Sequence, residues 1–350
     1  MVASMGLLSC SQLGYYAHLG TGQLSILLNR VPLEQAARDK KLPEEHRRKL
    51  ALIPHVRDFG TEVMGLRGGD TYQAFVQLDR SYANLVLSAA EPDALKPYRW
   101  RYPIVGAMSY RGYFSEKRAQ ADYDSLANQG YDVYLRPASA FSTLGWFDDP
   151  VLSPMLSMSE ARLVDTVLHE MTHVTLFFPG QTSFNETVAT FVGNQGAIKY
   201  LSLRHGARSG QVQDAIHAME DNQRFALFIQ ELLDGLRAIY AEPIERDEKI
   251  ARKESYLAEQ KQRFADEVVH SFHRPHVYER FPDREWNNAS LLARNAYYGD
   301  LDLFTRLYAA RGESLADFIR YLATWQGEAD PRARLVREID ENELIGRTKD

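Results

Sequence analysis

The motif H-E-x-x-H constrains this chain more than any other feature of its sequence. It spans His169 to His173 within the stretch TVLHEMTHVTLFFPGQTSFNETVA, residues 166–189. Two histidines four residues apart project from one face of a helix, close enough to bind one metal ion. Glu170 points roughly a quarter-turn away, so it can reach a metal-bound water without being a ligand. The motif therefore predicts a helix that binds a metal ion.

The residues around the motif predict the limits of this helix. Ser157 and Glu160 have the spacing of a capping box, which places the start of the helix near Ser157. Pro179-Gly180 predicts its end near Phe178. Apolar residues recur between these limits at helical spacing: Leu163, Val164, Val167, Leu168, Met171 and Val174. The two histidines lie off this apolar stripe, which favours a metal-binding role over packing.

A second helix, predicted to start at about Ser183, supplies the third ligand. Glu186 falls in its first turn, and the small residues Ala189, Gly193 and Ala197 follow on the same face. Such a face lets two helices approach closely. In an antiparallel hairpin, Glu186 and His173 would lie at nearly the same level, roughly 5 and 7 Å from the turn. The alternative is that Glu186 only completes a capping box with Ser183.

This set of residues predicts the chemistry of a mononuclear zinc site. His169, His173 and Glu186 would hold one Zn²⁺ per chain and leave a fourth position for water. Glu170 would act as the general base toward that water. A tyrosine is a common donor to the developing oxyanion. The tyrosine candidates, which the sequence does not rank, are Tyr110, Tyr113, Tyr297 and Tyr298. Asp165 and Asn185 are the candidates for residues that hold the ligands in position by hydrogen bonds.

Composition limits the classes of partner. The chain of 350 residues has a net charge of −6, with 45% hydrophobic and 25% charged residues. These proportions are typical of globular proteins. The negative charge argues against nucleic acid as the main partner. No apolar run approaches the length of a membrane span, so any membrane attachment would need a lipid.

The single cysteine suggests such an attachment. Cys10 ends the sequence Leu-Leu-Ser-Cys, which resembles a bacterial lipoprotein processing site. The segment before it is short and lacks the positive start of a signal peptide. We interpret residues 1–10 as the remnant of a signal segment, or as a disordered one, with Cys10 as the lipidation site. This predicts a lipid-anchored protein of the bacterial cell envelope or periplasm; the alternative is a cytoplasmic protein.

The rest of the chain predicts an α+β fold that is mainly α-helical. Helices are expected at 14–37, 42–60 and 116–130, and strands at 72–78, 84–89, 102–106 and 131–135. The strands form a small, antiparallel sheet preceding the H-E-x-x-H helix. We expect one domain over 11–350: a sheet-containing part at about 60–150, metal helices at 157–200, a helical hairpin at 212–272, and C-terminal helices at 285–326.

Several ordered motifs also resemble a known family. They are GYYAHLGTGQLSILL, YRGYF, FSTLGWFDDPVLSPML, LHEMTHVTLFF, FNETVATFVGNQGA and NNASLLARNAYY. The chain is similar, from about Ser11 to Gly327, to a predicted zinc-dependent aminopeptidase family of bacteria. The resemblance implies a single-domain, zincin-like metallopeptidase of the gluzincin type, often made as a lipoprotein. It assigns His169, His173 and Glu186 to the metal and Glu170 to catalysis, with a peptide or protein as substrate.

Three functions stay open at this point. An aminopeptidase must bind a free ammonium group, which requires an acidic residue near the metal; Glu116, Asp148 and Asp149 are available. A zinc endopeptidase needs no such residue. The third possibility is a catalytically silent envelope binding protein with a structural zinc.

Overall fold

The chain folds into a mainly helical structure with small β-sheets. The computed structural model describes residues 10–69, 71–102, 106–138, 149–312 and 314–347. The helices are α1 (Cys10–Leu28), α2 (Leu33–Arg38), α3 (Glu44–Glu62), α4 (Glu116–Asn128), α5 (Glu160–Thr175), α6 (Thr182–His205), α7 (Gly210–Ala241), α8 (Arg246–Asp266), α9 (Pro275–Tyr278), α10 (Asn288–Tyr298), α11 (Leu301–Arg311), α12 (Leu315–Ala323) and α13 (Pro331–Arg347). The predicted α+β class is confirmed at this level. Within these ranges, no helix is long and apolar enough to cross a membrane.

The strands form three small sheets instead of one. Strands β6 (Tyr110–Tyr113), β3 (Asn84–Ala90) and β7 (Asp132–Ala138) make an antiparallel sheet in that order. A second sheet contains β1 (Val31–Pro32), β2 (Ala74–Val76) and β8 (Val151–Leu152), and its β2–β8 pair is parallel. Strands β4 (Trp100–Tyr102) and β5 (Gly106–Met108) pair by themselves. The prediction of one antiparallel sheet is therefore wrong in detail, because β2 pairs with a strand about 75 residues further along the chain.

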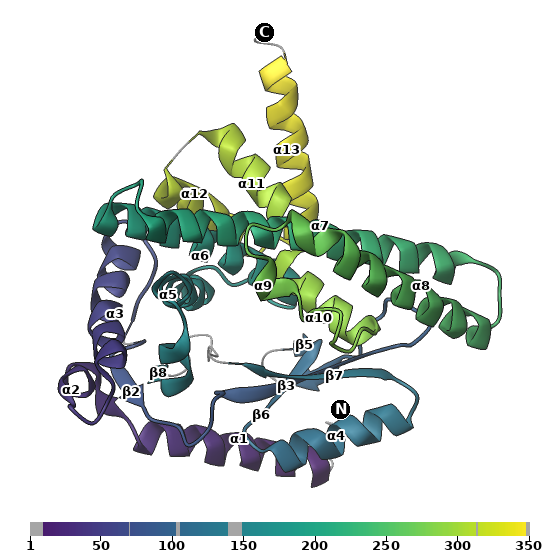
Figure 1. Ribbon diagram of the computed structural model, residues 1–350, viewed down its shortest axis with the longest axis horizontal. Coiled ribbons are helices and arrows are strands. Elements are labelled where there is room, and N and C mark those ends of the chain that lie inside the picture. The colour runs from purple at the N-terminus through teal and green to yellow at the C-terminus, as the bar shows by residue number, and fades with distance from the viewer. Residues whose placement is uncertain (1–9, 70, 103–105, 139–148, 313, 348–350) are drawn as a thin grey trace, which may run out of the picture.

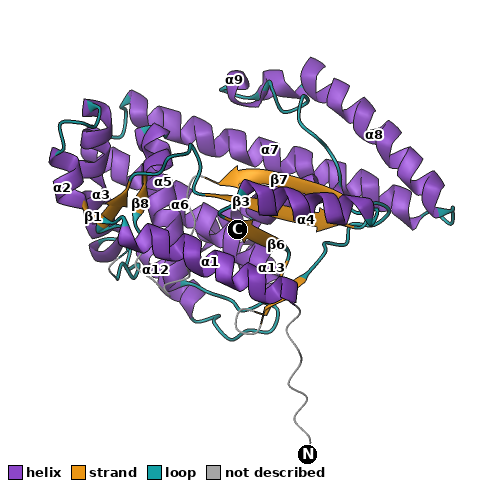
Figure 2. Cartoon of the chain, turned by 90° about the horizontal axis from the view of Figure 1, so that it is seen from below, coloured by secondary structure: helices purple, strands orange, loops and turns teal. Residues whose placement is uncertain are grey.

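The sheet β6-β3-β7 separates an apolar layer from a polar one. Successive side chains of a strand point to opposite faces. Leu85 and Leu87 of β3, Tyr113 of β6 and Val133 of β7 pack in one apolar cluster with Tyr15 of α1. Figure 1 shows α1 and α4 on this side of the sheet and α10 on the other, and Figure 2, seen from below, shows α4 in front of the sheet. Tyr113 places strand β6 against this apolar layer.

Helix α5 begins and ends inside its predicted limits. Its N-cap is Ser159, whose hydroxyl oxygen accepts a hydrogen bond from the backbone N–H of Arg162 at 3.2 Å. The predicted capping box at Ser157 is wrong, because Pro154 opens a short 3-10 turn, η1 (Ser153–Ser157), in which the Ser157 hydroxyl donates to the Pro154 carbonyl. The helix ends at Thr175, three residues before Phe178.

The side chain of Asn185 closes the turn between α5 and α6. Its Oδ1 accepts from the backbone N–H of Phe178 at 2.9 Å, and its Nδ2 donates to the Phe178 carbonyl at 2.8 Å. Helix α6 begins at Thr182 without any side-chain cap, so Glu186 is not half of a capping box with Ser183. The carboxylate of Glu186 is therefore available for another role.

Two glycines of α6 let the helix lie directly against α5. A Cβ atom at Gly193 would lie 2.6 Å from Asp165 Oδ1 and 2.9 Å from the Asp165 carbonyl oxygen. A Cβ atom at Gly196 would lie 2.7 Å from Leu168 Cδ1. Real Cβ atoms do not approach other atoms this closely, so the small-residue face predicted from the sequence is required by the packing of the two helices.

Helix α10 is fixed at its start by a buried carboxylate. Asp132 of β7 accepts hydrogen bonds from the backbone N–H of Asn288 at 2.8 Å and from Lys253 Nζ of α8 at 2.8 Å. A negative charge at a helix N-terminus is favourable, because the first backbone N–H groups lack partners within the helix. Asn287 and Ser290 add a capping box. These contacts set the position of α10 over the sheet.

The remaining helices cover α6 and α10. Helices α7 and α8 form a hairpin whose turn contains Pro243, as expected, and α11, α12 and α13 lie beyond α6 (Figure 1). Helix α13 was not expected, because its sequence is dominated by charged residues. Only Leu335 and Ile339, four residues apart, are apolar side chains of α13 buried in the core, among its residues whose burial is described.

We predict that Gly193→Ala destabilises the protein. The added methyl group would push α6 away from Asp165, at an overpacking cost of about 1–3 kcal/mol. Thermal unfolding should show a lower Tm. Gly210→Ala is the matched control, because Gly210 begins α7 and a Cβ atom there would meet nothing within 4 Å. An equal effect of both substitutions would contradict the close-approach explanation.

Candidate metal centre

His169, His173 and Glu186 converge on one point between α5 and α6. The Nε2 atoms of the two histidines are 3.1 Å apart. Glu186 Oε2 lies 3.6 Å from His169 Nε2 and 3.7 Å from His173 Nε2. Glu186 is the fifth residue of α6, and the Asn185–Phe178 hydrogen bonds hold the start of that helix beside the end of α5. The structure thus brings together the three residues that the sequence proposes as ligands.

The donor atoms fit a tetrahedral ion. Bonds of about 2.1 Å at tetrahedral angles place two ligand atoms about 3.4 Å apart. The three observed separations, from 3.1 to 3.7 Å, lie close to this value. Two imidazole nitrogens and one carboxylate oxygen are also the donor set of zinc sites that keep an open position. Among the described residues, this is the one group of three or more potential ligands able to hold a metal ion.

The charges of the site favour a cation. Burial alone would raise the pKa of Glu186, but the neighbouring His173 and His169 hold this pKa well below its usual range. The carboxylate is therefore negatively charged. Burial would lower the pKa of His173, and the carboxylates of Glu186 and Glu170 outweigh it and raise that pKa. A metal ion would replace the proton that this arrangement otherwise draws to the imidazole.

Glu170 lies next to the ligands. Burial raises the pKa of its carboxyl group, and the nearby His169 and His173 partly counteract the increase. No side chain of the described residues forms a hydrogen bond with the Glu170 carboxylate. Glu170 is therefore close to the ligands, and its carboxylate is available to accept a proton, as a general base requires.

Two of the four candidate tyrosines face the centre. Tyr297 of α10 stacks beside the His169 ring, with 6.4 Å between ring centroids. Tyr110 of β6 is partly buried, and the negative charges of Glu186 and Glu170 act on its hydroxyl. Burial raises the pKa of both tyrosines, so both hydroxyls keep their protons and can donate hydrogen bonds. Tyr113 points to the opposite face and donates to Asp122. The side chain of Tyr298 lies outside the described part of the chain.

Arg136 is a residue of the centre that the sequence analysis missed. Its Nη2 donates to the Tyr297 hydroxyl at 2.9 Å, and its guanidinium lies 5.3 Å from the centre of that ring. The predicted strand ended at Leu135, so Arg136 was not placed on a strand. The available signal was the alternation of Tyr134 and Arg136, which puts both side chains on the polar face of β7.

The other sequence candidates lie in different places. Asp165 is one turn before His169; its Oδ2 accepts from Arg162 at 2.8 Å, and its Oδ1 faces Gly193. Glu116 is exposed at the start of α4, on the far side of the sheet. Asp149 is 3% exposed. Asp148 and residues 1–9 lie outside the described residues, and Cys10 is the first residue of α1.

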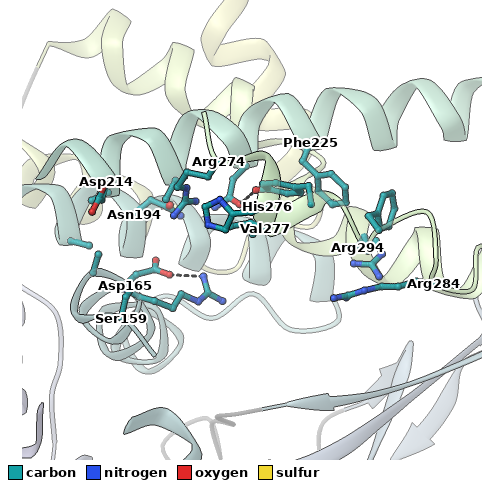
Figure 3. Close-up of a pocket in the computed structure, with 18 residues that line it drawn as sticks. Ser159, Asp165, Asn194, Asp214, Phe225, Arg274, His276, Val277, Arg284 and Arg294 are labelled. Atoms are coloured by element: carbon teal, nitrogen blue, oxygen red, sulfur yellow. Dashed lines mark hydrogen bonds and ion pairs between the residues drawn. The ribbon is translucent and has the colours of Figure 1, made fainter. Parts of the chain in front are cut away.

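A pocket of about 690 Å³ lies along α5, α6, α7 and α10, and its lining includes neither the three ligands nor Glu170. Its lining includes Asp165, one turn before His169 on α5, and Arg294, one turn before Tyr297 on α10. Figure 3 shows Asp165 and Asn194 near one end of this pocket and Arg284 and Arg294 at the other.

Comparisons with known proteins identify one family. The sequence model of a family described as "Putative aminopeptidase" matches residues 14–335. No curated protein and no solved structure matches the chain.

We predict that the purified protein binds about one divalent metal ion per chain and that the double change His169→Ala/His173→Ala abolishes binding. Glu186→Gln should weaken it, because the negative ligand is lost. Elemental analysis after dialysis measures this. His205→Ala is the control, since His205 also contacts a carboxylate, that of Glu160, at the far end of α6. A metal-free wild-type protein that does not take up zinc would contradict the assignment.

Proposed function

Because the chain belongs to the family described as "Putative aminopeptidase", we propose that its metal centre is the active site of a zinc-dependent peptidase, in its most specific form an aminopeptidase. The observation that carries the proposal is the convergence of His169, His173 and Glu186 beside Glu170, whose carboxylate accepts no hydrogen bond from a described side chain. A structural zinc would need no such free base. The residues around the centre have the chemistry that peptide hydrolysis requires.

The proposed mechanism gives each of these residues a role. His169, His173 and Glu186 would hold Zn²⁺, which would supply Lewis acidity when bound. Glu170 would accept the proton of the attacking water and deliver it to the leaving amine. Tyr297 and Tyr110, both protonated, would donate hydrogen bonds to the developing oxyanion. Arg136 would hold the Tyr297 hydroxyl in place through their hydrogen bond.

The proposed substrate path follows the sheet and the pocket. We propose a zincin-like arrangement in which the edge strand β6 aligns an extended peptide by backbone hydrogen bonds. In support, β6 is an edge of the sheet β6-β3-β7 and carries Tyr110. The pocket beside Asp165 and Arg294 would receive residues further from the cleaved bond. We also propose that the protein is related to the gluzincins, because Glu186 would be the third metal ligand.

An aminopeptidase needs an acidic residue that binds the ammonium group of its substrate, and the sequence offers three candidates. Of the three candidates, Glu116 lies away from the centre, Asp148 lies outside the described residues, and Asp149 is buried in the segment that leads through β8 to α5. Asp149 is therefore our candidate for the ammonium group. An endopeptidase stays the alternative, since it would use the same metal centre without this acid.

Attachment to the cell envelope is a separate proposal. It depends on the sequence Leu-Leu-Ser-Cys that ends at Cys10. A lipid on Cys10 would place the enzyme on a membrane surface in the envelope or periplasm, with peptides reaching it from solution.

We predict that Glu170→Gln keeps the bound metal and abolishes peptide hydrolysis. The amide is nearly the same size but cannot accept the proton, so kcat should fall by a factor of about 10²–10⁴. Digestion of a peptide library, read by mass spectrometry with a chelator control, measures the activity. Retained activity in Glu170→Gln would exclude this base, and a wild type that is inactive while holding zinc would favour the silent binding protein.

We further predict that acetylation of the substrate's N-terminus prevents cleavage. An aminopeptidase pairs the free ammonium group with an acidic residue, and acetylation removes that charge. The kcat/KM values for a peptide and its acetylated form should differ by about 100-fold or more. Equal values would identify the enzyme as an endopeptidase, with the metal centre unchanged.

A further inference from the structure

Arg136 is a cation of the metal centre that has no carboxylate partner among the described residues. Its Nη2 donates to the Tyr297 hydroxyl at 2.9 Å, and its guanidinium lies 5.3 Å from the centre of that ring. Within the described ranges, its side chain makes no other hydrogen bond and no ion pair. A guanidinium has five N–H donors, so most of the donors of Arg136 are unused.

These unused donors are accessible. Arg136 is only partly buried, and none of its side-chain nitrogens is buried without a partner. Arg136 pairs with Val86 of β3, and Val86 pairs with Gly112 of β6, so the three residues form one row across the polar face of the sheet. A Cβ atom at Gly112 would meet only Asn84 Nδ2, at 3.4 Å, among the described residues. Arg136 is therefore the one long side chain of its row, and the short side chains beside it leave room for a ligand.

Tyr297 connects Arg136 to the metal ligands. Its ring stacks beside that of His169, with 6.4 Å between the ring centroids. Burial raises the pKa of Tyr297, so its hydroxyl keeps its proton and can accept from Arg136 while it donates to a substrate. If it donates to the carbonyl oxygen of the cleaved bond, Arg136 Nη2 lies at most about 6 Å from that oxygen. Successive Cα atoms are about 3.8 Å apart, so Arg136 can reach the residue next to the cleaved bond.

The carboxylates on this side of the sheet have other partners. Asp132, on the same face of β7, accepts from Lys253 Nζ and from the backbone N–H of Asn288. Glu186 faces the two histidines. A partly buried guanidinium is stabilised by an anion, and its paired N–H groups match the two oxygens of a carboxylate. Arg136 thus has the chemistry of a carboxylate-binding residue.

We propose that Arg136 binds a carboxylate of the substrate, on the residue that follows the cleaved bond. This inference rests on the proposed peptidase function and names the substrate class. The carboxylate is either the free C-terminus of a short peptide or an acidic side chain. Arg136 repels an ammonium group, so the N-terminus of an aminopeptidase substrate lies on the other side of the cleaved bond.

Two pairs of peptides, each differing in one group, test the proposal on the full-length, zinc-loaded protein. One pair is a dipeptide with a free C-terminal carboxylate and the same dipeptide with a C-terminal amide. The other pair is an amidated tripeptide with glutamate or glutamine as its second residue. We expect kcat/KM to favour the carboxylate by about 10- to 100-fold in at least one pair, as for hydrogen bonds between charged groups. The pair that shows the preference identifies the source of the carboxylate.

Substitutions separate this role from the support of Tyr297. Arg136→Gln should bring the carboxylate-to-amide ratio close to one, and Arg136→Lys should keep part of it, because lysine retains the charge and loses the paired donors. Tyr297→Phe is the matched control. It should lower kcat/KM for both members of a pair alike and leave their ratio unchanged, because the Arg136 guanidinium remains.

Binding gives a measurement that does not depend on cleavage. Calorimetry with the same peptides and zinc-loaded Glu170→Gln should show a lower Kd for the carboxylate member, and the additional change Arg136→Gln should remove this difference. Equal kcat/KM values within both pairs for the wild type, or a preference that persists in Arg136→Gln, would overturn the role of Arg136. A wild type that cleaves no peptide but binds the carboxylate member through Arg136 would overturn the peptidase function and leave the binding site in place.

Discussion

The contact of α5 with α6 at Gly193 is the constraint on which the metal centre depends. Gly193 lets the α6 backbone touch Asp165, one turn before His169, and so fixes the separation of the two helices. The Asn185–Phe178 hydrogen bonds fix the turn that joins them. With the helix separation and the turn both set, only a residue near Glu186, the fifth of α6, can reach the two histidines. The ligand geometry is therefore a consequence of helix packing.

The groups that surround the ligands come from a second layer of the structure. Alternation along the strands sends Tyr110 and Arg136 to the polar face of the sheet, while Tyr113 and Val133 stay in the apolar layer. Asp132 holds the start of α10 over this face, and Tyr297 at the other end of that helix reaches His169. Helices α5 and α6 thus supply the ligands, and the sheet and α10 supply the side chains that surround them.

Local signals made the helices and the ligands predictable, whereas contacts between distant segments were not. His169, His173 and Glu186 lie within 18 residues of one another, so helical spacing and one turn sufficed to place them. Arg136 reaches the centre through the pairing of β7 with β3, and its alternation with Tyr134 indicates the polar face of a strand but not the helix that this face meets. The sheet was predicted as one unit because no local signal shows that β2 pairs with β8. The capping box at Ser157 failed for a local reason, the preceding Pro154.

The parallel pair β2–β8 has a consequence for how the centre can form. Phe75 and Val76 of β2 pair with Val151 and Leu152 of β8, just before α5, and β1 closes the other side of β2. A fragment that contained only the H-E-x-x-H helix and the residues after it would lack these partners. Pairing across such a distance is slow to form. Ribosomal synthesis delivers β1 and β2 first, so α5 emerges from the ribosome into a chain that already contains the strand on which its leading segment docks.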